Sequence, residues 1–180
     1  MASTSKFDSV EEYLKSGHMS DVKVTCGSRT WNLHKIILCR SPFFEKAFTG
    51  DFKEAHQNQM TLHDTEPQDV HGVIFYLYTG IISSDLEKDN SIQAYIQMFE
   101  LGDFFDIKDL RQHAVKRLTI KLADVARSVI DLVIRGNSHS GVPAEQFNDF
   151  SRLAQVAYST DSQTYEPLRQ LFLVFFARLP

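Results

Sequence analysis

The stretch from residue 20 to residue 80 constrains the fold more than any other part of the chain, because it opens with a clear hairpin pattern. Apolar and polar side chains alternate over residues 22–26, which is the period of a half-buried strand. Gly27-Ser28 follows as a two-residue turn, since glycine accepts the positive φ that such turns require. Residues 29–33 are therefore expected to return as a second strand.

The rest of this stretch predicts short helices and one more strand. Residues 36–38 are expected to form a short buried helix. Ser41-Pro42 begins the next helix, with serine as the cap and proline at the first helical position. Residues 60–62 alternate as a third strand, and a helix opened by Pro67 carries a wide apolar stripe as far as Gly80. Ile81-Ile82 is a candidate fourth strand at the sheet edge.

A short helix is expected at the N-terminus, over residues 7–15. Ser9 and Glu12 match a capping box, in which each side chain bonds the other residue's backbone N–H. Four apolar side chains of this helix fall near one face: Phe7, Val10, Tyr13 and Leu14. That face either packs on its own domain or packs on a second copy of the chain.

Only helical patterns follow residue 90. They are centred on residues 92–99, 107–118, 122–133, 143–157 and 168–179. The last is apolar nearly all round, so it is either buried against its neighbours or exposed as a docking surface. Early strands, late helices and no β-α-β alternation predict an α+β domain with a helical tail.

Composition narrows the classes of partner. The chain of 180 residues has a net charge of −4 and lacks a basic stripe, which argues against nucleic acid and against an anionic membrane surface. Its two cysteines are too few for a disulfide framework. No apolar run approaches the roughly 20 residues of a membrane span, and no signal peptide is evident. We therefore expect a protein of the cytoplasm or the nucleus.

Catalytic and metal-binding patterns are weak. Asp21, His34 and Ser41 contain the residue types of a hydrolase triad, but no nucleophile elbow or glycine-rich oxyanion loop accompanies them. We expect Asp21 beside His34-Lys35 to be a buried polar pair that fixes the fold. The cysteines and histidines show no short zinc-ligand spacing, and no phosphate-binding glycine motif is present. The sequence therefore predicts no catalytic residue, no metal and no cofactor.

Five short motifs occur in order, and together they resemble the BTB/POZ domain family. They are Ser20-Asp21-Val22, Leu33-His34-Lys35-x-x-Leu38, Ser41-Pro42-Phe43-Phe44, Phe52-Lys53-Glu54 and Tyr76-Leu77-Tyr78-Thr79-Gly80. The resemblance implies a helical cluster capped by a small three- to four-stranded sheet. It assigns residues 1–17 to an N-terminal tail and short helix, 18–120 to the BTB/POZ domain and 121–180 to a helical extension. The style of the chain is similar to that of small fungal members.

The resemblance also implies a non-enzymatic protein–protein interaction module that self-associates as a homodimer and acts as a scaffold or adaptor. Two alternatives stay open: a substrate adaptor that binds a cullin in a ubiquitin ligase, and a fragment of a transcriptional repressor that recruits a corepressor. The loop over residues 81–90 is longer and more acidic than in typical cullin adaptors, which counts against the first alternative. The residues expected at the self-association surface are Phe7, Val10, Tyr13, Leu14, Asp21 and Lys35. The residues expected at a partner-binding surface are Phe48, Phe52, Tyr78 and Phe105.

Overall fold

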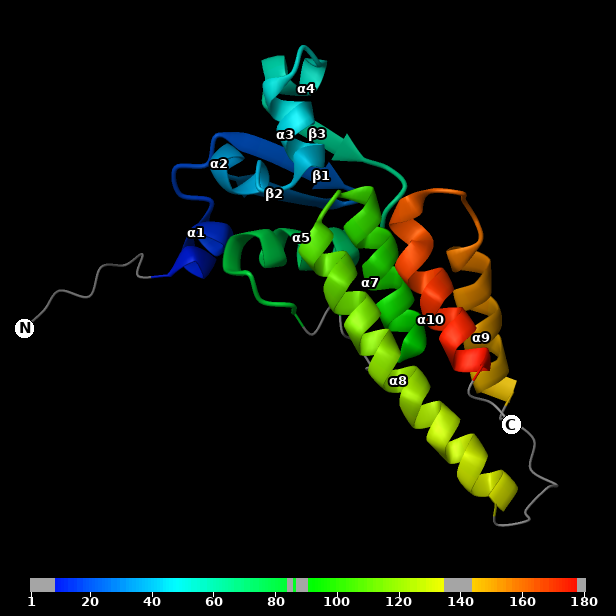
Figure 1. Ribbon diagram of the computed structural model, residues 1–180. Helices are drawn as coiled ribbons and strands as arrows, with labels where there is room; N and C mark the ends of the chain where they lie inside the picture. The colour runs from blue at the N-terminus through cyan, green and yellow to red at the C-terminus, as the bar shows by residue number, and fades with distance from the viewer. Residues whose placement is uncertain (1–8, 84–85, 87–90, 135–143, 178–180) are drawn as a thin grey trace, which may run out of the picture. The chain divides into compact units, whose positions relative to one another are not determined.

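The computed structural model describes residues 9–83, Leu86, 91–134 and 144–177 (Figure 1). Its chain forms two compact units. One comprises Met1–Lys88 with Phe104–Ile107, and the other comprises Asp89–Asp103 with Lys108–Pro180. No helix in the described part of the chain is long and apolar enough to cross a membrane.

A three-stranded sheet with the order β2-β1-β3 organises the first unit. Strand β1 (Val22–Cys26) pairs antiparallel with β2 (Arg29–Leu33) and parallel with β3 (Gln59–Leu62). The alternation along β1 places its three apolar side chains in the core. Gly27 has φ +54° in the turn between β1 and β2, which is the left-handed conformation that the hairpin requires. The three predicted strands are confirmed.

Five helices surround this sheet in the described part of the first unit (Figure 1). They are α1 (Val10–Ser16), α2 (Lys35–Leu38), α3 (Pro42–Thr49), α4 (Lys53–Gln57) and α5 (Pro67–Thr79). Helix α5 ends at Gly80, whose φ of +70° closes the last turn through a hydrogen bond to the Tyr76 carbonyl. Helix α1 packs against α5, so the N-terminal helix is part of this unit.

Stacked aromatic rings form the centre of the first unit. The Phe44 ring stacks on Phe48 and on Phe105, with centroid separations of 6.3 and 5.4 Å. The hydroxyl of Ser41 donates to the Phe105 carbonyl at 2.5 Å and accepts from the Phe44 N–H at 3.5 Å. A single buried hydroxyl therefore caps α3, as predicted, and also fixes the chain that returns at Phe105.

Three local predictions in the first unit are wrong. The Ser9 side chain makes no cap bond, and the first turn of α1 is closed instead by the Glu12 N–H donating to the Ser9 carbonyl at 3.1 Å. Ile36 is 84% exposed rather than buried, because a one-turn helix cannot turn three consecutive side chains to the same side. Ile81-Ile82 lies after α5 without strand pairing, so the sheet has three described strands and not four.

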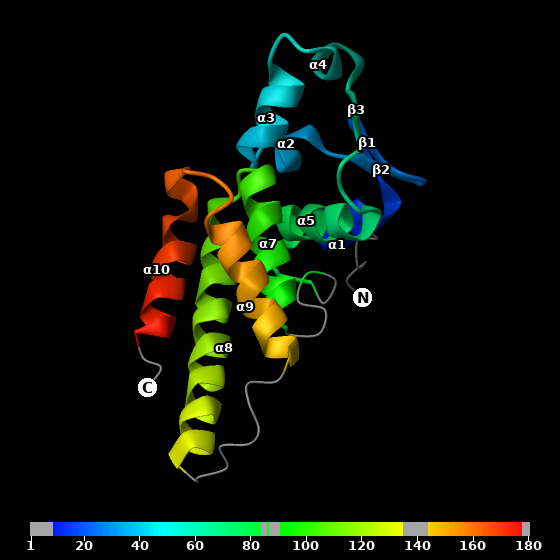
Figure 2. The same cartoon turned by 90° about the vertical axis from the view of Figure 1, so that its right-hand side faces the viewer.

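The second unit is helical. Its elements are α7 (Ile92–Phe104, of which the last residue belongs to the first unit), α8 (Lys108–Ile134), α9 (Ala144–Ala157), the 3₁₀ turn η1 (Gln163–Tyr165) and α10 (Glu166–Phe176). Helix α10 packs against both α8 and α9, and the two views show these helices side by side (Figures 1 and 2). Two predicted helices, over 107–118 and 122–133, are one continuous helix, because no glycine or proline interrupts the backbone between them.

Polar contacts tie α7 to the other elements of the second unit. From α8, the Arg117 guanidinium donates a hydrogen bond of 2.9 Å to the hydroxyl of Tyr95 on α7. The Tyr165 hydroxyl of η1 donates to the Asp103 carboxylate at 3.0 Å, and burial followed by this hydrogen bond raises the pKa of Tyr165 to about 12. Helix α10 combines the two predicted outcomes: Leu168 is buried, whereas Leu173 is 54% exposed.

Candidate functional site

The junction of the α1–β1 loop with α2 is held by two side chains that the sequence had singled out. One Asp21 carboxylate oxygen accepts from the Lys35 N–H at 2.7 Å, in the first turn of α2. The His34 ring lies between the His18 carbonyl, 2.7 Å from Nε2, and the Tyr78 hydroxyl, 2.7 Å from Nδ1. Asp21 is exposed, so the prediction of a buried Asp21–His34 pair is wrong. The carboxylate caps α2 from the loop between α1 and β1.

Tyr78 connects this junction to α5. Its hydroxyl accepts from the His34 N–H at 3.0 Å, and its ring meets the His34 ring edge-on. Burial, with a smaller contribution from the Asp21 carboxylate, raises the pKa of Tyr78 to about 12, although the hydrogen bond from His34 acts in the opposite direction. Tyr78 therefore remains a neutral structural group at physiological pH.

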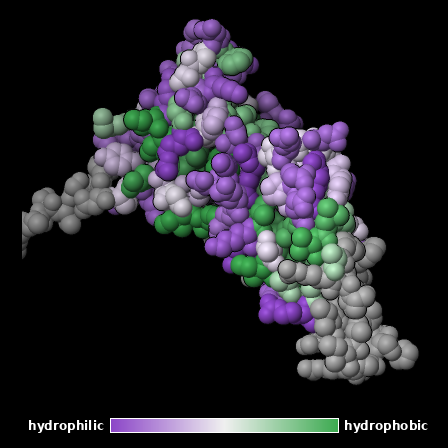
Figure 3. Space-filling view, viewed as in Figure 1, coloured by the Kyte–Doolittle hydropathy of each residue, from purple (hydrophilic) through white to green (hydrophobic). Residues whose placement is uncertain are grey.

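The segments that meet at this junction carry exposed apolar side chains, and we call these residues the α1–α2 face: Val10, Tyr13, Met19 and Ile36. Val10 is 46%, Met19 76% and Ile36 84% exposed, and Tyr13 is half-buried with its ring edge-on to His34. Figure 3 shows hydrophobic side chains over α1 and α2 on this side of the first unit. Since large side chains of this kind rarely face water together without a partner, the face is a candidate interface.

The structure divides the residues that were predicted for self-association. Val10 and Tyr13 belong to the α1–α2 face, and Asp21 and Lys35 lie at its edge. Leu14 is buried in the contact with α5, and Phe7 lies outside the described residues. The sequence did not predict Met19 or Ile36 as surface residues of this face. The exposure of Ile36 could have been predicted from the length of α2, because a helix of one turn buries only one of its sides.

Three of the four residues predicted for partner binding are core residues. Phe48, Tyr78 and Phe105 are at most 4% exposed. The prediction that these three side chains lie on a surface is therefore wrong. They point inward from α3, α5 and the 104–107 segment and pack in the core. Phe52 is 59% exposed and remains a candidate.

Phe52 borders a cavity of about 420 Å³ in the first unit, which we call the Phe52 pocket. Phe43, Met60 and Phe104 contribute apolar lining, while Lys46, Glu54 and Asp106 add charge at the rim. The Phe104 ring lies 5.2 Å from the Phe43 ring and is 47% exposed. Gly50 allows the Phe52 ring to fold close, because a Cβ at residue 50 would lie 3.2 Å from that ring and only 2.7 Å from the Lys46 carbonyl.

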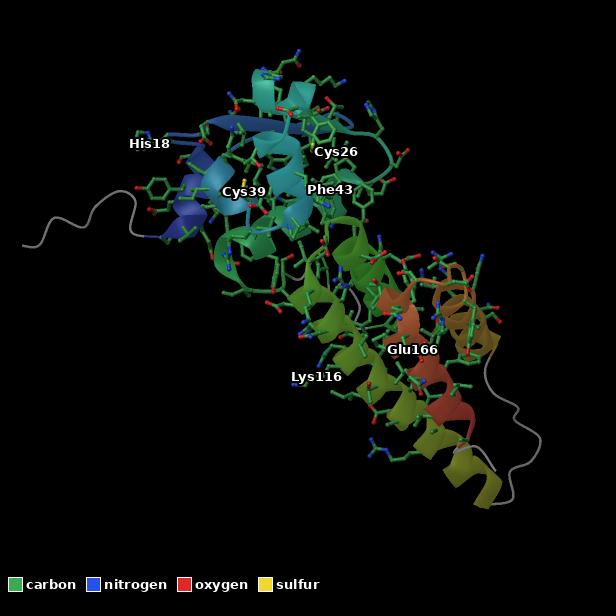
Figure 4. The ribbon with its side chains drawn as sticks, turned by 45° about the horizontal axis from the view of Figure 1, so that its top comes forward. His18, Cys26, Cys39, Phe43, Lys116 and Glu166 are labelled. Carbon is green, nitrogen blue, oxygen red and sulfur yellow. The ribbon has the colours of Figure 1, made fainter. Side chains whose placement is uncertain are left out.

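The residues considered for chemistry are used structurally. Ser41 is fully buried and donates to a carbonyl, so its hydroxyl faces no substrate. The Cys26 thiol donates to the Thr65 carbonyl at 2.9 Å, and burial raises the pKa of both cysteines. Figure 4 labels them on separate elements of the first unit. Within the part of the chain that the structure describes, no three His, Cys, Asp or Glu side chains come together as metal ligands.

The first unit thus combines a small mixed sheet with a helical cluster and exposes apolar side chains at two places. The family model of the BTB/POZ domain matches residues 10–122. Since this match covers more than half of the chain, the chain belongs to the BTB/POZ domain family, as its five motifs indicated.

Three curated relatives share parts of the sequence. Mouse germ cell-less protein-like 2 is 34% identical over 76 residues, 40% of this chain and 15% of that protein. Human Kelch-like protein 5 is 33% identical over 85 residues, 47% of this chain and 11% of that protein. Mouse Rho-related BTB domain-containing protein 1 is 27% identical over 154 residues, 83% of this chain and 21% of that protein. The chain thus spans about a fifth or less of these relatives, and they lend no support to a fungal likeness.

Among solved structures, the BTB domain of zebrafish PATZ1 is similar with a TM-score of 0.47 and 18% sequence identity. The likeness covers 58% of this chain and 80% of that one.

Proposed function

We propose that this chain is a non-enzymatic interaction module that self-associates through the α1–α2 face. The observation that carries the proposal is the exposure of Val10, Met19 and Ile36 around a junction that hydrogen bonds hold in place. Removing one such side chain from water contributes about 1.5–3 kcal/mol when burial is complete. In a twofold dimer each contribution occurs twice, because the same patch serves both copies.

Size-exclusion chromatography with light scattering tests this proposal. We expect the unmodified chain to elute as a dimer and the double variant Val10→Asp with Ile36→Asp to elute as a folded monomer, because a carboxylate in an apolar contact must be desolvated. Leu14→Asp is unsuitable, since Leu14 lies in the core contact of α1 with α5.

The matched control is Ile120→Asp, which places the same charge at a residue that is 46% exposed on α8 of the second unit. It should remain dimeric. A monomeric unmodified chain, or a double variant that stays dimeric, would remove the proposal.

A second candidate function is that of an adaptor that binds a cullin through the Phe52 pocket. The supporting observation is the pair of exposed rings, Phe52 and Phe104, on an apolar cavity with a charged rim. The motif that contains Phe52 is also one of the five that resemble the family. In the sequence, the charged loop over residues 81–90 counts against cullin binding. Most of this loop lies outside the described residues, so the structural support for cullin binding comes from the Phe52 pocket alone.

Calorimetric titration with the N-terminal region of a cullin tests the adaptor function. We expect Phe52→Asp to weaken binding by about tenfold or more, which corresponds to about 1.4 kcal/mol. Ile120→Asp serves as the control, since Ile120 is 46% exposed on α8 and does not line the Phe52 pocket, and it should bind normally. An absence of binding to the unmodified chain at high concentration would exclude the adaptor function and leave self-association intact.

The third possibility, a repressor fragment that recruits a corepressor, is favoured by no particular surface of the described residues. For the module as a whole we propose a location in the cytoplasm or the nucleus, where the two thiols would stay reduced.

A further inference from the structure

A cavity in the second unit combines apolar surface with positive charge, and self-association through the α1–α2 face does not use it. Its volume is about 420 Å³, and its walls come from α7, α8, η1 and the start of α10. Phe99, Val115 and Pro167 supply the apolar floor, whereas Lys108, Arg111 and Lys116 supply cations along one wall. We call this cavity the Arg111 pocket.

The floor is held in place before any ligand arrives. Phe99 is 1% exposed, and its ring lies edge-on to the Tyr165 ring at 5.2 Å. Tyr165 is in turn fixed by its hydrogen bond to Asp103. A site whose walls are already ordered binds at a lower entropic cost than one that must form around its ligand.

One cation is part of the wall and two are available. The Arg111 guanidinium donates to the Gly102 carbonyl at 2.9 Å and lies 3.9 Å from Asp103, so its charge is partly neutralised. Lys108 and Lys116 are exposed, and among the described residues neither has a carboxylate within ion-pair distance. Lys116 extends from α8 into solvent in Figure 4. The excess of positive charge is local, since the whole chain has a net charge of −4.

We propose that the Arg111 pocket binds an acidic peptide segment of a partner protein, with one aromatic or aliphatic side chain packed on Val115 and Pro167 above the buried Phe99 ring. Carboxylates on either side of that anchor would meet Lys108 and Lys116. Gln112 and Gln163 at the edge offer amide donors and acceptors for the peptide backbone. Opposite charges at the edge select the partner and speed its encounter, while the buried anchor supplies most of the affinity.

Charge and shape favour this occupant over others. A nucleic acid needs a longer basic track than three cations on an acidic chain. A small metabolite is held by pockets that enclose most of its surface, whereas this cavity is open to solvent. An extended peptide needs only a socket for one side chain and charges along its path.

Fluorescence anisotropy with defined peptides tests the proposal on the full chain. The probes are labelled peptides in which one Leu or Phe is flanked by Asp and Glu residues. In one control series the anchor is replaced by Ser, and in a second the acids are replaced by Asn and Gln. We expect dissociation constants of about micromolar order for the acidic anchored series and weakening of about tenfold or more in either control. Binding should also weaken with added salt, because exposed charges are screened.

Variants locate the binding. Lys108→Glu with Lys116→Glu should weaken the binding of the acidic peptides by about tenfold or more. Val115→Asp should weaken their binding as well, because it removes the anchor site. The matched control is Lys121→Glu with Lys23→Glu, which makes the same change in net charge outside the pocket and should leave affinity within about twofold. The variant Val10→Asp with Ile36→Asp should also bind normally, so failure of self-association and failure of this proposal are distinguishable.

Four outcomes would overturn the proposal. The first is that no acidic anchored peptide binds, and the second is that the uncharged peptides bind equally well. The third is that Lys108→Glu with Lys116→Glu binds the acidic peptides as tightly as the control Lys121→Glu with Lys23→Glu. The fourth is that a second copy of the chain displaces the peptide as protein concentration rises. The last would make the pocket an interface between copies.

Discussion

Ser41 is the residue with the most structural consequence for its size. Its buried hydroxyl donates to the Phe105 carbonyl and caps α3 at the Phe44 N–H. Ser41→Ala should therefore lower the free energy of unfolding by about 1–3 kcal/mol, because two buried backbone groups lose a partner. Urea titration followed by circular dichroism measures the change.

Ser9 provides the matched control for Ser41. It occupies the same position before α1, yet its side chain makes no cap bond. Ser9→Ala should therefore change stability by no more than about 0.5 kcal/mol. Equal effects of the two substitutions would contradict the role given to Ser41.

Two tyrosines make stability depend on alkaline pH. Burial is the first cause that raises the pKa of Tyr78 and of Tyr165 to about 12. In the unfolded chain a tyrosine loses its proton near pH ~10, so the unfolded state ionises first. The stabilising contribution is therefore complete below pH ~10 and is lost as pH rises through about 12.

Urea midpoints measured at increasing alkaline pH test this dependence. The double variant Tyr78→Phe with Tyr165→Phe should lose stability less steeply above pH ~10 than the unmodified chain does. Tyr158→Phe is the control, since Tyr158 is exposed, and it should keep the original slope. The slope is the decisive readout, because Tyr78→Phe also removes a hydrogen bond from His34 and lowers stability at every pH.

At the scale of elements, Gly72 decides how α5 packs. A Cβ on this residue would lie 2.6 Å from Leu86 Cγ and 2.8 Å from Leu86 Cδ2. Alanine favours a helix over glycine by about 1 kcal/mol, but overpacking typically costs about 1–3 kcal/mol. We expect Gly72→Ala to destabilise the chain or, at best, to leave its stability unchanged.

A double-mutant cycle with Leu86→Ala separates the two effects on Gly72. Once Leu86 is shortened, Gly72→Ala should become stabilising by about 0.5–1 kcal/mol, because only helix propensity remains. If Gly72→Ala has the same effect with and without Leu86, the close approach of the two residues is not what glycine permits.

The elements differ in how far the sequence could predict them. The hairpin could be predicted from the alternation over residues 22–26 and from Gly27, because both signals depend only on residues close together in the sequence. The break expected before Leu122 was wrong, because a change of apolar face does not stop a helix that lacks a glycine or proline. Ile36 and Phe48 show the limit: which apolar side chain meets the core depends on helix length and on distant partners such as Phe105.

At the scale of the whole molecule, self-association links stability to protein concentration. If the folded chain is a dimer and the unfolded chain is a monomer, mass action favours the dimer as concentration rises. For a chain of this length the unfolding temperature should increase by about 2 °C per tenfold increase in concentration. Differential scanning calorimetry over a wide range of concentrations measures the shift.

Breaking the α1–α2 face should remove this dependence without unfolding the chain. Val10→Asp with Ile36→Asp should give one unfolding temperature at all concentrations, equal to that of the unmodified chain when dilute, because both side chains are exposed in the single chain. Ile120→Asp on α8 should keep the dependence. A temperature that stays constant for the unmodified chain would mean that folding does not require a partner copy, and the exposed apolar side chains would then need another occupant.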